Sequence, residues 1–147
     1  MSARILLLFT SAVALVAGAP VSIGADNPGG QCAVVPGRAA AEIKFASDIQ
    51  PVFDDNCVAC HQTGSANQGL VLESGQSYGH IVGKGSTEAK VTLVAPGNPG
   101  KSYLFSKISG TQKEAGGNGA RMPLGGTLDA QSTALICNWI ANGAPNN

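Results

Sequence analysis

Five consecutive residues, Cys57-Val58-Ala59-Cys60-His61, constrain the fold of this chain more than any other feature. Two cysteines separated by two residues and followed directly by a histidine form the pattern typical of covalent haem attachment. The spacer lets both thiols form thioether bonds at one porphyrin edge, and the histidine becomes the proximal ligand of the iron. The sequence therefore predicts one covalently attached haem c, held by Cys57, Cys60 and His61.

Two other uses of a Cys-x-x-Cys pair fit the chain less well. A thioredoxin-like redox pair would need a βαβ context, which the sequence pattern lacks. A zinc site would need a second pair of cysteines or histidines at ligand spacing, and none follows the motif. Haem attachment is therefore the favoured interpretation.

Residues 1–25 have the pattern of a secretory signal peptide. Arg4 gives a positive start, residues 5–16 are apolar, and small residues follow. The apolar run is too short for a membrane span, so none is expected if the signal is cleaved. Cleavage after Ala25 is favoured, because cleavage after Ala19 would leave a proline first. An uncleaved segment would instead act as an anchor. The prediction is a periplasmic or otherwise extracytoplasmic protein, and haem attachment and disulfides both suit that oxidising location.

Charge is unevenly distributed along the chain. Residues 26–60 carry five acidic and two basic side chains, whereas residues 61–147 carry four acidic and six basic ones. This balance argues against a nucleic-acid partner, which would require a basic patch. A dipolar surface would help to steer redox protein partners, although solvated charge that keeps a small protein soluble is an equally good explanation.

The sequence divides into an irregular strap at 26–44 and one domain at 45–147. The strap is rich in Gly, Pro and Ala and has no helical periodicity. A first helix is predicted from Ser47, where Ser47 and Gln50 resemble a capping box and Pro51 falls in the first turn. One face of this helix is apolar, and the helix leads directly into the haem motif.

Two more helices are predicted in the second half of the domain. A short helix over 102–108 follows a turn in which Asn98 can cap and Pro99 takes the first helical position. A last helix runs from about Asp129, a plausible N-cap, to about Asn142. The segments 75–85 and 110–120 are rich in glycine, and we expect the second of them to be a mobile loop.

From about Phe45 onward the chain resembles small class I c-type cytochromes, and more closely the monohaem cytochrome c domains common in planctomycete-type proteins. The resemblance implies an all-α cytochrome c fold around one haem, with the first and last helices packed crosswise. The strap and Cys32 lie outside the match. Besides the haem motif, the resemblance rests on Gly69-Leu70-Val71-Leu72, Pro96-Gly97-Asn98-Pro99, Ser102-Tyr103-Leu104, Arg121-Met122-Pro123 and Trp139-Ile140 with Gly143-Ala144.

Met122 is the expected sixth ligand of the iron. The only other methionine is Met1, and Met122 matches the distal ligand position of the family. A His/Met pair raises the reduction potential relative to a His/His pair. Two alternatives remain, namely that Met122 only fills the core and that His80, the only other histidine, takes the sixth position.

Two cysteines remain once the haem motif is set aside. In an exported protein, Cys32 and Cys137 are expected to pair. Cys137 lies toward the flank of the apolar face of the last helix, where a passing strap can reach it. The prediction is a Cys32–Cys137 disulfide that fastens the strap to this helix. The alternative is a buried free Cys137 and an unattached Cys32.

The predicted function is single-electron transfer between redox partners, with the protein as an electron carrier and not an enzyme. One alternative is a haem subunit docked on a larger oxidoreductase or haem assembly. Another is a ligand-binding or peroxidase-like haem with an open sixth position. Arg121 is expected to pair with a haem propionate, and the alternative is a solvated arginine. The expected contributors to the haem pocket are Phe53, Leu70, Leu72, Tyr103, Leu104 and Trp139, and the alternative for each is an ordinary core position.

Overall fold

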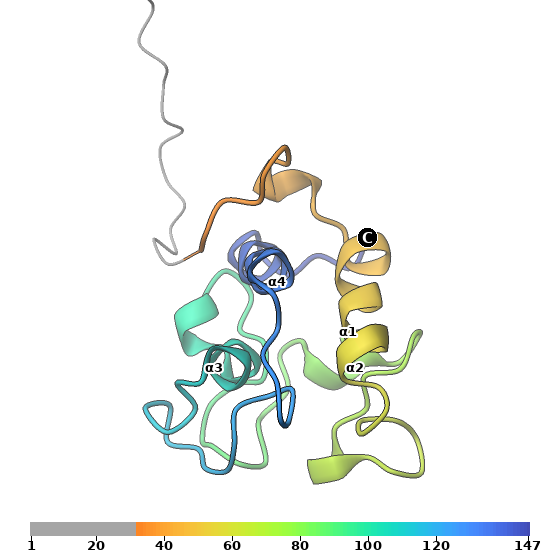
Figure 1. Ribbon diagram of the computed structural model, residues 1–147, viewed down its shortest axis with the longest axis vertical. Coiled ribbons are helices and arrows are strands. Elements are labelled where there is room, and N and C mark those ends of the chain that lie inside the picture. The colour runs from red at the N-terminus through yellow and green to blue at the C-terminus, as the bar shows by residue number, and fades with distance from the viewer. Residues whose placement is uncertain (1–31) are drawn as a thin grey trace, which may run out of the picture.

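The computed structural model describes residues 32–147, and short helices joined by loops account for most of that part of the chain (Figure 1). Contacts of β type are confined there to three isolated bridges. The structure therefore confirms the all-α prediction. The predicted signal peptide and residues 26–31 of the predicted strap lie outside the described residues. The helices are η1 (Ala40–Glu42), η2 (Phe45–Ile49), α1 (Gln50–Asn56), η3 (Asn67–Gly69), α2 (Ser77–Ile81), η4 (Pro99–Lys101), α3 (Tyr103–Ser109) and α4 (Ala130–Ala141).

The first helical segment begins earlier than the sequence predicts. It opens at Phe45 with a π-helical turn, and Ser47 lies inside this turn, so the predicted capping box is wrong. Burial explains the earlier start, because Phe45 and Ile49 are both core residues. Pro51 stands at the start of α1. A wide turn just before it avoids the clash between a proline ring and the carbonyl four residues earlier.

The predicted caps of the later helices are confirmed. The Asn98 side chain accepts a hydrogen bond from the Lys101 N–H at 3.1 Å, and Asp129 accepts one from the Ser132 N–H at 2.8 Å. The helix predicted over 102–108 is α3, which is displaced by one residue at each end. The short helix α2 lies in a stretch for which no helix was predicted.

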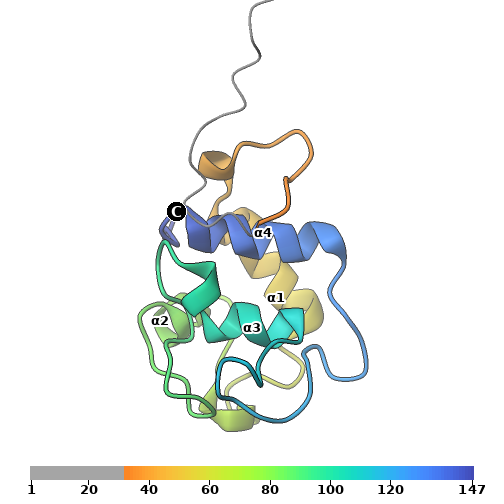
Figure 2. The same ribbon diagram turned by 90° about the vertical axis from the view of Figure 1, so that its left-hand side faces the viewer.

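The helix α4 crosses the segment formed by η2 and α1 and runs alongside α3 (Figures 1 and 2). Aromatic side chains fill the crossing. The Phe45 ring centroid lies 5.2 Å from that of Trp139 and 5.2 Å from that of Tyr78. Trp139 is fully buried, and its indole N–H donates to the Pro145 carbonyl at 2.9 Å. The core therefore joins the beginning and the end of the domain.

The described part of the strap runs over the outer side of α4 before it reaches η2 (Figure 1). The sulfur atoms of Cys32 and Cys137 lie at disulfide-bond distance, 2.03 Å, as the sequence analysis expects. The Asn138 side-chain amide also donates to the Ala33 carbonyl at 2.8 Å. Val35 is buried, whereas its neighbour Val34 is 84% exposed. The described part of the strap is thus attached to α4 at Cys32 and Ala33, and it contributes Val35 to the core.

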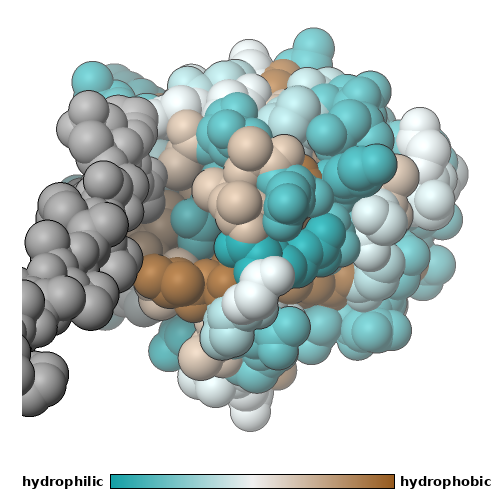
Figure 3. All heavy atoms as spheres, turned by 90° about the horizontal axis from the view of Figure 1, so that it is seen from above, coloured by the Kyte–Doolittle hydropathy of each residue, from teal (hydrophilic) through white to brown (hydrophobic). Residues whose placement is uncertain are grey.

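Figure 3 views the face of the molecule that carries the strap. Its surface is mostly hydrophilic, and apolar atoms, shown in brown, form a narrow band across the lower part of the view. None of the helices that the structure describes is both long and apolar enough to cross a membrane.

Candidate haem site

The haem motif forms two tight turns directly after α1. The Cys57 N–H continues the helical pattern by donating to the Phe53 carbonyl at 2.8 Å. The Cys57 carbonyl then accepts hydrogen bonds from the Cys60 N–H at 3.1 Å and the His61 N–H at 3.0 Å. These bonds fold the five residues back on themselves, so that the two thiols and the imidazole leave one short, fixed segment.

Both thiols of the motif are free. Cys57 is half-buried, and Cys60 is exposed. Burial, together with the neighbouring Cys60, raises the pKa of the Cys57 thiol to about 11. A thiol-disulfide oxidoreductase needs a lowered pKa at its attacking cysteine. The raised value therefore weighs against the thioredoxin-like alternative.

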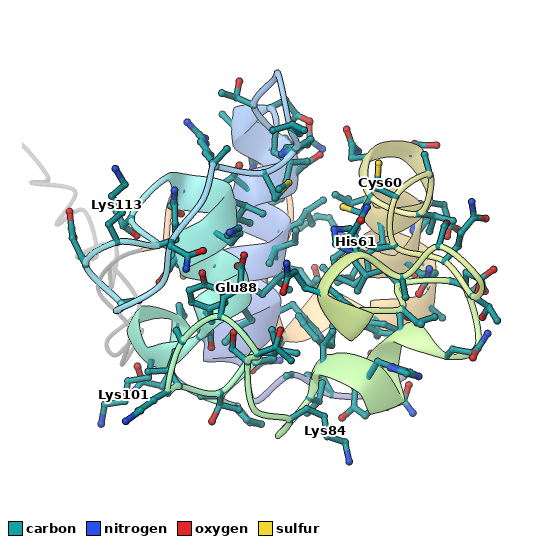
Figure 4. All side chains as sticks on the ribbon, turned by 90° about the horizontal axis from the view of Figure 1, so that it is seen from below. Cys60, His61, Lys84, Glu88, Lys101 and Lys113 are labelled. Carbon is teal, nitrogen blue, oxygen red and sulfur yellow. A yellow bond between two sulfur atoms is a disulfide. The ribbon has the colours of Figure 1, made fainter. Side chains whose placement is uncertain are left out.

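His61 is half-buried, and its Nδ1 atom is buried without a hydrogen-bond partner. Its backbone is firmly held, because its carbonyl accepts the Leu72 N–H at 2.7 Å. Leu72 is held in turn from α1, since the Gln50 side-chain amide donates to the Leu72 carbonyl at 3.0 Å. Figure 4 shows His61 on the side of the motif that faces α3, whereas Cys60 lies farther from α3.

Met122 lies in the long connection between α3 and α4 and is half-buried. Its N–H donates to the Lys107 carbonyl at 3.0 Å, and the adjacent Arg121 Nε donates to the Ile108 carbonyl at 2.7 Å. The last carbonyls of a helix lack partners within the helix. Residues 121–122 thus cap the C-terminal end of α3, and this contact fixes the backbone of Met122.

The chemistry of these groups fits a covalently attached haem. Two free thiols from one short turn suit thioether attachment, and imidazole and thioether are the two axial ligands of cytochromes c. A buried polar atom without a partner is costly. The unpaired Nδ1 atom of His61 therefore indicates that the surroundings of this imidazole are incomplete without a bound group. No group of three or more His, Cys, Asp or Glu side chains placed to hold a metal ion occurs among residues 32–147.

A buried polar cluster, which the sequence analysis did not identify, lies beside this site. Lys107 of α3 forms an ion pair with Glu88, with an Nζ–Oε2 distance of 2.6 Å, and the Tyr103 hydroxyl donates to the same Oε2 atom at 2.9 Å. In Figure 4 Glu88 lies on the side of its loop that faces His61. Lys107 and Tyr103 stand one helical turn apart, a spacing visible in the sequence, but Glu88 comes from a distant loop.

The pKa of Glu88 depends on its partners in this cluster and on the nearby His61. Burial by itself would raise the pKa of the Glu88 carboxyl. Hydrogen bonds from Lys107 and Tyr103, together with the charge of Lys107 and the nearby His61, outweigh burial and lower this pKa. Burial and the neighbouring Glu88 raise the pKa of Tyr103 to about 12. Glu88 is therefore ionised at neutral pH, and Tyr103 remains protonated.

Most of the predicted pocket residues belong to the hydrophobic core, and Leu70 packs against its edge. Tyr103 is buried as well, but its hydroxyl belongs to the polar cluster. His80, the rival ligand, lies exposed on α2. Arg121, expected at a propionate, contacts the end of α3 and lines a cavity of about 330 Å³ between the strap, α3 and α4. The residues that line this cavity include neither His61 nor Met122.

No family model, curated protein or solved structure matches this chain.

Proposed function

We propose that this protein is an extracytoplasmic monohaem c-type cytochrome, which transfers single electrons between redox protein partners. The observation that carries the proposal is the turn formed by Cys57, Cys60 and His61 after α1. Both thiols there are free, and the Nδ1 atom of the imidazole is buried without a partner. The orphaned nitrogen, the two sulfur atoms and the resemblance of the motif to class I cytochromes all favour the same bound group.

In this proposal Cys57 and Cys60 would hold the haem covalently, and His61 and Met122 would bind its iron. The bound haem supplies reversible one-electron chemistry at the iron. The chain supplies two axial ligands of fixed backbone position. The His61 backbone is held through Leu72, and the Met122 backbone is held at the end of α3. A protein without a free axial position suits electron transfer better than the binding of small ligands.

The test is the optical spectrum of the purified exported protein in both redox states, compared between wild type and Met122→Ala. We expect haem that stays bound after denaturation, and a weak long-wavelength band of Met–Fe ligation in the oxidised wild type that disappears in the variant. A high-spin oxidised wild type would instead indicate an open sixth position and ligand-binding or peroxidase-like chemistry. A low-spin spectrum that the substitution does not change would indicate His80 as the ligand.

A matched variant, His80→Ala, separates these outcomes. His80 is exposed on α2, so its replacement should leave the fold and the Met–Fe band unchanged. If His80→Ala, and not Met122→Ala, converts the iron to high spin, the His61/Met122 assignment is wrong. Haem that is released by denaturation would contradict covalent attachment through Cys57 and Cys60.

A further inference from the structure

The loop that leads to Met122 is fastened to one residue of α3 at two points. The Lys107 carbonyl accepts the Met122 N–H at 3.0 Å, and the Lys107 ammonium donates to the Asn118 carbonyl at 2.9 Å. Lys107 therefore holds the segment from 118 to 122 through both its backbone and its side chain. The second contact exists only while the ammonium group points away from solvent.

Glu88 and Tyr103 keep the ammonium group in that position. The Lys107 side chain is 11% exposed and that of Glu88 is 17% exposed, so both charges are largely removed from water. A buried ammonium group without a counter-charge would turn outward or destabilise the fold. The Glu88 carboxylate supplies the charge, and the Tyr103 hydroxyl fixes the carboxylate by donating to the same oxygen at 2.9 Å.

The loop is also packed closely against the cluster. A Cβ atom built on Gly117 would lie only 2.0 Å from the Tyr103 hydroxyl oxygen, so this position accepts only glycine without a shift. The Gln112 side-chain amide donates to the Gly119 carbonyl at 3.1 Å. The loop over 110–120, predicted to be mobile, thus contacts α3 through Asn118 and Gly117, and one hydrogen bond within the loop joins its two ends.

We infer that Lys107 is a positioning residue for Met122, and that Glu88 and Tyr103 hold Lys107 in place for this role. The inference rests on the proposed function, because it concerns the ligand that Met122 provides. Loss of the ammonium group releases Asn118. The segment before Met122 is then held only by the Met122 N–H, by the contact of Arg121 with Ile108 and by that of Gln112 with Gly119. The thioether then leaves the iron more often, although the covalent haem and His61 are unaffected.

The experiment measures how readily imidazole displaces Met122 in the oxidised holoprotein. Imidazole occupies the sixth position only when Met122 is away, so its apparent affinity reports the fraction of open molecules. In Lys107→Met, which keeps the apolar stem, this affinity should rise by about tenfold or more, because the open fraction is larger. Equal affinities in wild type and Lys107→Met would overturn the inference while leaving the proposed function intact.

Two further variants separate positioning from stability alone. The double variant Lys107→Met with Glu88→Gln removes both buried charges, so it should regain stability toward urea relative to Lys107→Met. It still lacks the contact with Asn118, so its imidazole affinity should remain raised. A return to the wild-type affinity would overturn the inference. Tyr103→Phe, a mild change that keeps the ring, should give a smaller rise of about two- to threefold, and no rise would contradict the role of Tyr103.

The matched control is Asp48→Asn, which breaks a second ion pair on the strap side of the molecule. Asp48 pairs with Arg38 and makes no contact with the Met122 loop in the described residues. Its replacement should leave imidazole affinity within twofold of wild type, about 0.4 kcal/mol. An increase as large as that in Lys107→Met would show that general destabilisation is sufficient and would overturn the inference. A low-spin wild type without Met ligation would overturn this inference and the assignment of Met122 as ligand, whereas a high-spin wild type would overturn the proposed function as well.

Discussion

Phe45 and Trp139, 94 residues apart in the chain, lie with their ring centroids 5.2 Å apart and their planes inclined at 39°. Phe45 opens the first helical segment, and Trp139 lies in the last turn of α4. This contact joins the segment that leads to the haem motif to the last helix. The geometry around His61 therefore depends on residues near both ends of the domain.

Replacement of Phe45 by alanine should strongly destabilise the protein. Phe45 is 6% exposed and contacts three other aromatic rings. The loss of buried surface and the resulting cavity should lower the free energy of unfolding by about 3–5 kcal/mol. Urea denaturation measures this difference. The control is Val34→Ala at an exposed strap position, which should change stability by less than about 0.5 kcal/mol. Equal effects of the two substitutions would disprove the role assigned to Phe45.

The features that the sequence predicted well are those set by neighbouring residues. The caps at Asn98 and Asp129 need only a side-chain oxygen and an N–H three residues later. The start of the first helix was predicted wrongly at Ser47, because burial of Phe45 across the domain outweighs a local capping signal. The Cys57–His61 motif is contiguous and is visible in the sequence alone, and the haem that it predicts stays a prediction. The contact of Glu88 with Lys107 depends on a loop whose path no local pattern determines.

The Cys32–Cys137 disulfide should stabilise the protein most when no haem is attached. Because it links positions 105 residues apart, its removal from a chain without other restraints would cost about 4.7 kcal/mol. Attached haem already restrains the unfolded chain, so the cost in the holoprotein should be smaller. The free energies of unfolding of a Cys32→Ser/Cys137→Ser variant, with and without haem, test this. An equal loss in both forms would contradict the explanation, and an unchanged stability in both would show that the pair does not form.

The ion pair between Arg38 and Asp48 should stabilise the fold in a pH-dependent manner. Arg38 Nη2 donates to Asp48 Oδ2 at 2.9 Å, and the Lys44 N–H donates to the same oxygen at 2.7 Å. The hydrogen bond from Arg38, with help from Lys44, lowers the pKa of Asp48 below its ordinary value of 3.8 despite partial burial. A lowered pKa favours the folded state above the unfolded-state value, and this advantage disappears as pH falls through the folded-state value.

The comparison of wild type with Asp48→Asn tests this dependence. The difference in free energy of unfolding should be constant near neutral pH and should shrink once the pH falls below 3.8. Urea denaturation at a series of pH values measures it. High salt should reduce the difference, because the pair lies near the surface. A difference that grows on acidification would contradict the assignment.

The two thiols of the haem motif should differ in reactivity in the haem-free protein. The pKa of Cys57 is raised to about 11, so at pH 8 only about one molecule in a thousand carries the reactive thiolate there. Burial hinders the reagent at Cys57 as well, whereas Cys60 is exposed. Iodoacetamide should therefore label Cys60 first, as peptide mass analysis would show, and both residues equally after unfolding in urea.

In the holoprotein neither residue should react, because both sulfur atoms would be thioethers. Faster labelling of Cys57 than of Cys60 would contradict its burial, and labelling of either in the holoprotein would contradict attachment through that residue.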